Sequence, residues 1–153
     1  MTTRVVRSAL PSDATIALGT TALAVAAMAV DHLLGDDPGL EDLPTFGLTT
    51  ALSIALAAVV FGWVVPRARA ASASSAEAPA RRALVLGVLA FVPGVATLWL
   101  GFPFVLAGGG LALGLRARWE KTAGPATAAV VVAGAALALA TLAYLGQAAA
   151  KLS

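Results

Sequence analysis

The chain has 153 residues, of which 59% are hydrophobic and 12% are charged, whereas soluble domains are about 45–50% apolar and about 25% charged. A soluble fold of this size could not bury so much apolar surface, so the composition predicts an all-α integral membrane protein, a polytopic helical bundle whose partner is the lipid bilayer. The chain has no cysteine, which excludes disulfides, thiolate metal sites and cysteine nucleophiles. The formal net charge of +2 does not indicate nucleic acid as a partner, because the basic residues are few and stand in short segments between apolar runs.

The first predicted membrane span covers residues 14–34. Ser12 or Asp13 can cap its first turn, and Gly35 followed by Pro38 ends it. At about 1.5 Å per residue, a helix of this length crosses a hydrocarbon core of about 30 Å.

A cleavable signal peptide is an alternative for the same segment. Arg4 and Arg7 precede the apolar run, and Ala27-Met28-Ala29 resembles a cleavage signal. The apolar run is longer than the core of a usual signal peptide, which favours an uncleaved anchor.

The second predicted span covers residues 46–65 and follows a short acidic loop. That loop, residues 35–45, combines clustered acidic side chains with two prolines that break regular structure. Pro66 is expected to stop the span, since proline lacks the amide hydrogen that continues a helix.

A basic segment rich in alanine, serine and proline, residues 66–82, divides the chain. It carries four arginines against the single Glu77, and this composition predicts a solvated, flexible linker. Residues 1–65 would then form a two-span N-terminal hairpin, and residues 83–153 would form a three-segment C-terminal part of one compact membrane domain.

The stretch 83–115 contains no charged side chain and is too long for one ordinary span of about 17–25 residues. Glycine and proline in residues 101–103 predict a turn between two helices, residues 83–100 and 104–115. A single kinked helix and a re-entrant segment are the alternatives.

The last predicted span covers residues 126–149, and Pro125 suits its first turn. The count is therefore about five membrane segments, or four if residues 83–115 cross only once. With five segments and the N-terminus inside, nine basic side chains are cytoplasmic and only Lys151 is outside; with four segments the split is seven to three. Because short cytoplasmic loops accumulate Lys and Arg, this pattern favours five segments, a cytoplasmic N-terminus and an extracytoplasmic C-terminus.

The basic residues also indicate a source. Eight of the ten are arginine, and alanine is abundant, which is typical of a GC-rich bacterial genome. The predicted location is therefore the inner (plasma) membrane.

Asp31, His32, Asp36 and Asp37 form the one polar cluster that could do chemistry, and Asp31, His32 and Asp36 are its candidates for holding a metal ion or moving a proton. On a continuous helix, His32 and Asp36 would stand on one face, a spacing that can present two metal ligands. Gly35 is expected to end the helix first, so the favoured interpretation is a span end that faces water. No catalytic, cofactor or metal site is therefore predicted.

Hydroxyl side chains in or near the spans are expected to bond their own helix backbone, and no further role is assigned to them. They are Thr20, Thr21, Thr49, Thr50, Ser53, Thr97 and Thr141.

Gly110 and Gly114 form a G-x-x-x-G pair in an apolar helix, and small residues of this kind allow helices to approach closely in a bilayer. The expected contact is the hairpin partner, on which Gly87 and Gly94 lie roughly on one face. Self-association of the chain is the alternative. Ala57 on the second span is expected to tolerate a larger side chain better than Gly110 or Gly114.

The back half of the chain reads ALVLGVLAFVPG at 83–94, PFVLAGGGLALGLRAR at 103–118 and ATAAVVVAGAALALATLAYL at 126–145. This pattern resembles a widespread bacterial domain of unknown function found in small membrane proteins. That domain has an LVLGxLxxxxG helix, a tight turn, a second glycine-rich helix ending in arginine, a short loop and an AxAGxxLG-type helix. The resemblance covers residues 83–145, departs from the pattern at Pro93 and at the glycine triplet, and implies no assigned catalytic residue.

These observations predict a small structural or accessory membrane protein that acts through helix–helix contacts, with itself or with another membrane protein. An oligomeric transporter or channel component is the alternative, because Thr, Ser and Gly positions of several copies could line a pathway. A membrane enzyme with an outward-facing site at Asp31, His32 and Asp36 is a further alternative. The favoured interpretation involves no cofactor.

Overall fold

The computed structural model describes residues 12–34, 43–70, 78–97, 100–119 and 123–152. Throughout these residues the regular structure is helical and contains no strand, which confirms the all-α class predicted from the sequence. The elements are α2 (Asp13–Leu33), α3 (Leu43–Val59), the π-helical turn η2 (Val60–Val64), α4 (Val65–Ala70), α5 (Ala78–Ala96), α6 (Phe102–Trp119) and α7 (Ala123–Leu152). Most of the predicted acidic loop, including Asp36, and residues 71–77 of the predicted linker lie outside the described residues.

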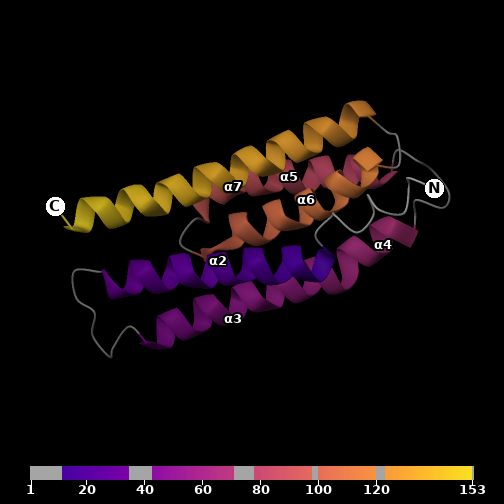
Figure 1. The fold of residues 1–153 in the computed structure, drawn as a ribbon. Helices are drawn as coiled ribbons and strands as arrows, with labels where there is room; N and C mark the ends of the chain where they lie inside the picture. The colour runs from indigo at the N-terminus through magenta and orange to yellow at the C-terminus, as the bar shows by residue number, and fades with distance from the viewer. Residues whose placement is uncertain (1–11, 35–42, 71–77, 98–99, 120–122, 153) are drawn as a thin grey trace.

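Successive helices run in opposite directions, so the bundle has two ends (Figure 1). The starts of α2, α5 and α7 and the ends of α4 and α6 lie at one of them. We call it the arginine end, because it carries Arg67, Arg69, Arg81, Arg82, Arg116 and Arg118. The end of α2, the start of α3 and the end of α7 lie at the opposite end, which we call the C-terminal end.

Local capping chemistry explains where the first and last helices begin. The Oγ of Ser12 accepts a hydrogen bond from the backbone N–H of Thr15 at 3.1 Å, and Asp13 stands in the first turn of α2, where a negative charge is favourable. Pro125 lies in the first turn of α7, where the missing amide hydrogen costs nothing. Both starts agree closely with the sequence prediction.

Three helical stretches are long and apolar enough to cross a membrane: Asp13–Leu33, Leu43–Ala70 and Gly124–Leu152. The predicted count of five membrane segments is not supported, because among the described helices α5 and α6 do not reach this standard. Arginines stand near the start of α5 and in the last turn of α6, which shortens the apolar part of each. The stretch 83–115 is nevertheless not one kinked helix, since a turn separates α5 from α6.

The second span does not end at Pro66, contrary to the prediction. In a regular α-helix a proline ring clashes with the carbonyl group four residues earlier and removes a hydrogen bond. Here the π-helical turn η2 directly precedes the proline, and the N–H of Val65 donates to the carbonyl oxygen of Val60, five residues back. The register of the hydrogen bonds changes at this point, and the helix continues as α4 to Ala70.

The basic segment 66–82 is helical at both ends, which corrects the prediction of a flexible linker throughout. Its first residues belong to α4, and its last residues belong to α5, which begins at Ala78. α6 likewise extends to Trp119, beyond the predicted end at residue 115. The division of the chain at this segment stays a prediction.

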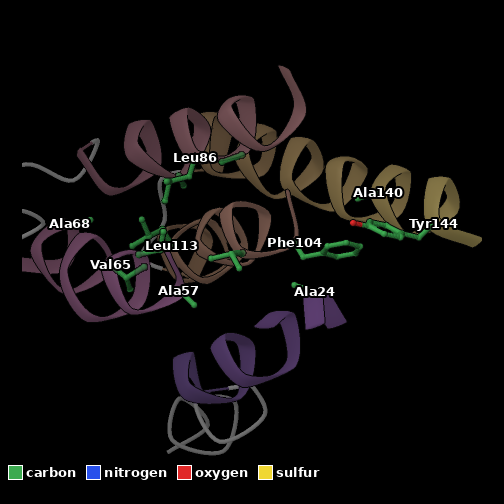
Figure 2. Packing of buried hydrophobic residues seen from close by; sticks show 13 residues of the cluster. Ala24, Ala57, Val65, Ala68, Leu86, Phe104, Leu113, Ala140 and Tyr144 are labelled. Carbon is green, nitrogen blue, oxygen red and sulfur yellow. The ribbon is translucent and has the colours of Figure 1, made fainter. Parts of the chain in front are cut away.

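α6 is the central helix of the bundle. It contacts α5 and α7 along its length and also α2, α3, η2 and α4. Its residues Phe104, Val105 and Leu113 are among the largest fully buried side chains. Figure 2 shows the Phe104 ring beside that of Tyr144 on α7, with ring centroids 5.6 Å apart. A helix surrounded in this way is apolar on all its faces.

The glycine triplet 108–110 brings several neighbours close to α6. A Cβ atom built on Gly108 would lie 2.5 Å from Oγ1 and 2.7 Å from Cγ2 of Thr20 on α2. One built on Gly109 would lie 2.6 Å from Cγ1 of Val60 in η2. Real Cβ atoms essentially never show such distances, so α2 and η2 approach α6 only because these positions lack side chains.

The other side of α6 faces α5 and α7. A Cβ atom on Gly110 would lie 3.1 Å from Cβ of Ala133 on α7 and 3.2 Å from the carbonyl oxygen of Ala83 on α5. One on Gly114 would lie 2.9 Å from Cγ2 of Val130 on α7. The glycine pair singled out from the sequence therefore lies inside one chain, and Gly114 faces α7 rather than the expected hairpin partner.

On α5, Gly87 and Gly94 were both expected to contact Gly110 and Gly114, and the structure describes the surroundings of Gly87 alone. The amide nitrogen of Gly87 is 3.3 Å from the Cβ position of Gly110, and a Cβ on Gly87 would lie 3.2 Å from Cγ1 of Val132. Gly94 lies in α5, but its surroundings fall outside the described residues. Close approach is thus seen for Gly87, Gly110 and Gly114.

Gly108→Ala is expected to destabilise the bundle by about 1–3 kcal/mol, because the new methyl group would overlap Thr20. Thermal unfolding of the purified protein in detergent measures this loss. Gly134→Ala is the matched control: a Cβ on Gly134 meets no atom within 4 Å. Ala57, the control expected from the sequence, is unsuitable because it is buried.

Thr20→Ala in the Gly108→Ala background removes the two nearest atoms and should restore part of the lost stability. Equal unfolding midpoints for Gly108→Ala and Gly134→Ala would contradict the close approach of α2 and α6.

Candidate functional site

Asp31 forms an ion pair with the end of the chain. The Nζ atom of Lys151 on α7 lies 2.9 Å from Oδ1 of Asp31 and 3.4 Å from its carbonyl oxygen. Both side chains are partly exposed. The carboxylate that the sequence offered as a metal ligand or proton carrier thus joins α2 to α7 at the C-terminal end.

His32 packs against an aromatic ring. Its imidazole is stacked on Phe46 near the start of α3, with ring centroids 5.2 Å apart and an interplanar angle of 21°. Asp36, the other member of the predicted ligand pair, lies outside the described residues. Within the described part of the chain, no group of three His, Cys, Asp or Glu residues could hold a metal ion.

A second ion pair closes the opposite end of α2. Asp13 in the first turn of α2 pairs with Arg69 in the last turn of α4. Asp13 and Asp31 are about 27 Å apart along α2 at 1.5 Å per residue. The two ion pairs therefore lie at the two ends of the bundle, and α2 is joined to α4 at one and to α7 at the other.

The polar contact of most structural consequence lies between these ends and was missed from the sequence. Ser53 of α3 is fully buried, and its Oγ donates a hydrogen bond to the carbonyl oxygen of Leu100 in the turn between α5 and α6. The Sδ atom of Met28 on α2 is 3.9 Å from the same Oγ. A serine from one helix thus satisfies a backbone acceptor of another.

The turn that receives this hydrogen bond is built around Gly101. Its φ angle is +68°, in the left-handed region that favours glycine. A Cβ at this position would also lie 3.1 Å from Cβ of Ala24 and 3.4 Å from Oγ of Ser53. The backbone N–H of Phe104 donates to the carbonyl oxygen of Gly101 at 3.2 Å, which starts α6. The turn is therefore held both by its own backbone and by α2 and α3.

Three other hydroxyl groups behave as the sequence predicted, whereas the buried Oγ1 of Thr50 has no hydrogen-bond partner among the described residues and departs from that prediction. Thr20 donates to the carbonyl oxygen of Ile16 at 2.8 Å, Thr49 donates to that of Phe46 at 3.0 Å, and Thr141 donates to that of Leu137 at 2.8 Å. Each of these bonds stays within one helix, as is usual for threonine in apolar helices. Ser53 differs because its acceptor comes from a different part of the chain.

Comparison with protein-family models, with curated proteins and with solved structures found no match for this chain. The resemblance of residues 83–145 to a bacterial membrane domain therefore stays a prediction.

Ser53→Ala is expected to destabilise the bundle by about 1–3 kcal/mol, because it leaves the half-buried Leu100 carbonyl without the hydrogen bond that Ser53 donates. Thr141→Val is the matched control, since it removes a hydroxyl that bonds only its own helix. Thermal unfolding in detergent compares the two variants. If Thr141→Val were as destabilising as Ser53→Ala, the contact between α3 and the turn would not have the importance assigned to it.

Proposed function

We propose that this chain is an integral membrane protein in which three helical stretches cross the bilayer and α5 and α6 form a re-entrant hairpin. The three stretches have the length and composition of membrane spans. Their outer surfaces are apolar: Leu18 on α2, Leu48 on α3 and Leu142 on α7 are each more than half exposed. In water such surfaces would be unfavourable, and in a bilayer they face hydrocarbon.

The spacing of charged groups supports this arrangement. The ion pairs Asp13–Arg69 and Asp31–Lys151 join helices at the two ends of the bundle. Their separation of about 27 Å along α2 approaches the thickness of a hydrocarbon core, about 30 Å. The pairs would thus lie at the two interfaces, where ionised groups keep contact with water.

In this arrangement the hairpin of α5 and α6 enters the hydrocarbon core from the arginine end and turns back inside it. Its turn lies beside Ala24, and that level is about 14 Å from the end of α2 at Leu33. Non-helical backbone at such a depth is tolerated only where protein satisfies it. The hydrogen bond from Ser53 to the Leu100 carbonyl supplies such satisfaction, which favours a re-entrant hairpin over two complete crossings.

The orientation follows from the arginines. Six described arginines lie at the arginine end, while Lys151 is the one described lysine or arginine at the C-terminal end. Basic residues accumulate on the cytoplasmic side, so we place the arginine end and the N-terminus in the cytoplasm and the C-terminus outside the inner (plasma) membrane. A re-entrant hairpin leaves both of its ends on one side, as two full crossings would, so this orientation is the same for three and for five segments.

Single cysteines test the topology without background, because the chain has none. In intact cells a membrane-impermeant maleimide should label Ser153→Cys, and it should label Ser74→Cys only after permeabilisation. Thr97→Cys, near the hairpin turn, should resist the reagent in intact cells. Labelling of Thr97→Cys as fast as Ser153→Cys would mean that the hairpin crosses completely, and labelling of Ser74→Cys from outside would reverse the orientation.

We further propose that the protein acts as a structural or accessory membrane protein through helix–helix contacts with itself or with another membrane protein. The observation that carries this proposal is the outer face of α3 and η2. Small residues recur there every three or four positions and are all exposed: Gly47, Ala51, Ala55, Ala58 and Gly62. Small residues at this spacing let another helix approach closely.

The glycines on this outer face differ from those on α6 in the space around them. On α6, Gly108, Gly109, Gly110 and Gly114 all have neighbours inside the contact distance of a Cβ atom. On this outer face, a Cβ atom built on Gly47 of α3 or on Gly62 of η2 would have no atom within 4 Å. The helices of the bundle pack closely against the glycines of α6, whereas these two are open, as are Gly19, Gly134 and Gly146. The transport alternative receives less support, because the hydroxyls of Thr20, Thr49 and Thr141 are already bonded within their own helices.

A photo-crosslinking amino acid at Ala55 tests the accessory role in living membranes. We expect a discrete protein adduct, whose mass distinguishes a second copy of this chain from another protein. Ala51→Leu in the same background should remove most of that adduct, because the larger side chain prevents close approach. The control is the crosslinker at Leu139, an exposed position on α7. Equal adducts from both positions, or none from Ala55, would contradict a contact through α3.

A further inference from the structure

The arginine end carries a strong excess of positive charge. Its described charged residues are Arg67, Arg69, Arg81, Arg82, Arg116, Arg118 and Asp13. Asp13, the acidic member of this set, is already paired with Arg69. The positive dipole ends of α2, α5 and α7 lie here beside the negative dipole ends of α4 and α6, so the arginines supply most of the excess positive charge. This end is therefore suited to an anionic partner.

Within this surface, Arg67 is held over an exposed aromatic ring. Its guanidinium carbon lies 4.2 Å from the centroid of the Trp63 ring. Trp63 is 58% exposed although it is large and apolar. Stacking restricts the guanidinium to the outer face of η2 and α4, so less conformational entropy is lost when it binds a ligand. Tryptophan in such a position is typical of the headgroup region of a bilayer.

Arg82 joins this pair from α5. Its Nη1 donates a hydrogen bond to the carbonyl oxygen of Arg67 at 3.2 Å, one of the last carbonyls of α4, which lack helical partners. A guanidinium has five N–H donors, and this contact uses one. Arg82 is exposed, so its other donors stay accessible. The hydrogen bond thus anchors a second cationic side chain next to α4.

Apolar surface continues from these polar groups towards the middle of the bundle. Val59 stands one helical turn before Trp63 on α3, and Val85 stands one turn after Arg82 on α5. Their exposed fractions are 51% and 52%. A ligand with both an anionic and a hydrocarbon part could contact the arginines and the adjoining apolar surface together, whereas a free anion would contact only the arginines.

We propose that Trp63, Arg67 and Arg82 form a binding site for the phosphate headgroup of an anionic phospholipid, with its acyl chains lying along Val59 and Val85. The two guanidiniums would donate charge-assisted hydrogen bonds to the phosphate oxygens. Basic sites between membrane helices on the cytoplasmic side bind anionic headgroups in this way. The inference rests on the proposed insertion into a bilayer and adds a specific lipid class to it.

The test uses the full chain in nanodiscs of phosphatidylcholine, with or without phosphatidylglycerol. Native mass spectrometry counts the retained lipids, and thermal unfolding measures stabilisation. We expect phosphatidylglycerol to be retained and to raise the unfolding midpoint of the parent protein. Arg67→Gln and Arg82→Gln should each weaken its apparent affinity by about fivefold, and Trp63→Leu should weaken it less. Arg118→Gln is the control, with the same change in net charge at the same end on α6.

Stabilisation is scored as the difference between the two lipid compositions. Losing the α4 cap by itself would lower the unfolding midpoint equally in both lipid compositions. A smaller difference between the two compositions in Arg82→Gln therefore reports weaker lipid binding. The proposal is overturned if Arg118→Gln weakens binding as much as Arg82→Gln, which would indicate a diffuse charged surface. It is also overturned if phosphatidylcholine is retained equally, or if inorganic phosphate alone gives the same stabilisation. Failure of the parent chain to enter nanodiscs at all would instead disprove the bilayer-spanning function itself.

Discussion

Helices in a bilayer gain little from burying apolar side chains against one another, because lipid is equally apolar, so their association depends on close packing. In this chain the closest packing occurs at one place, the triplet Gly108-Gly109-Gly110. Within this single turn α6 meets α2 through Thr20, η2 through Val60, and both α5 and α7 through the last glycine. The ion pairs at the helix ends join helices that this triplet already holds in register.

The second constraint is the cost of exposing backbone to hydrocarbon. α5 and α6 are joined by a turn that lies beside the middle of α2 and α3. In the proposed arrangement this level is inside the bilayer, which offers no water to the carbonyl groups of the turn. Glycine at position 101 allows the turn, and Ser53 satisfies the carbonyl of Leu100. The hydrogen bond therefore depends on the close packing around α6, because that packing places Ser53 of α3 within reach of the Leu100 carbonyl.

The features predicted well from the sequence are those decided by neighbouring residues. Ser12 caps α2 and Pro125 starts α7 through local chemistry, so both helices begin near their predicted positions. Pro66 was misjudged, because the π-helical turn that accommodates it is a departure from the regular hydrogen-bond register. The role of Ser53 could not be predicted, because its acceptor lies 47 residues away and no local pattern connects the two. The count of five spans is not supported, because three helical stretches among the described residues are long and apolar enough to cross a membrane, and α5 and α6 are not among them.

The two partners of the hydrogen bond between Ser53 and Leu100 are synthesised in a fixed order. A chain is synthesised from its N-terminus, so α2 and α3 emerge before the hairpin whose turn they receive. In the proposed arrangement the hydroxyl donor is then already in place when the Leu100 carbonyl enters the membrane. The same C-terminal half, inserted without the helices that precede it, would bring an unsatisfied backbone group into hydrocarbon. The order of the helices along the chain thus places the hydroxyl donor before the carbonyl acceptor that it satisfies.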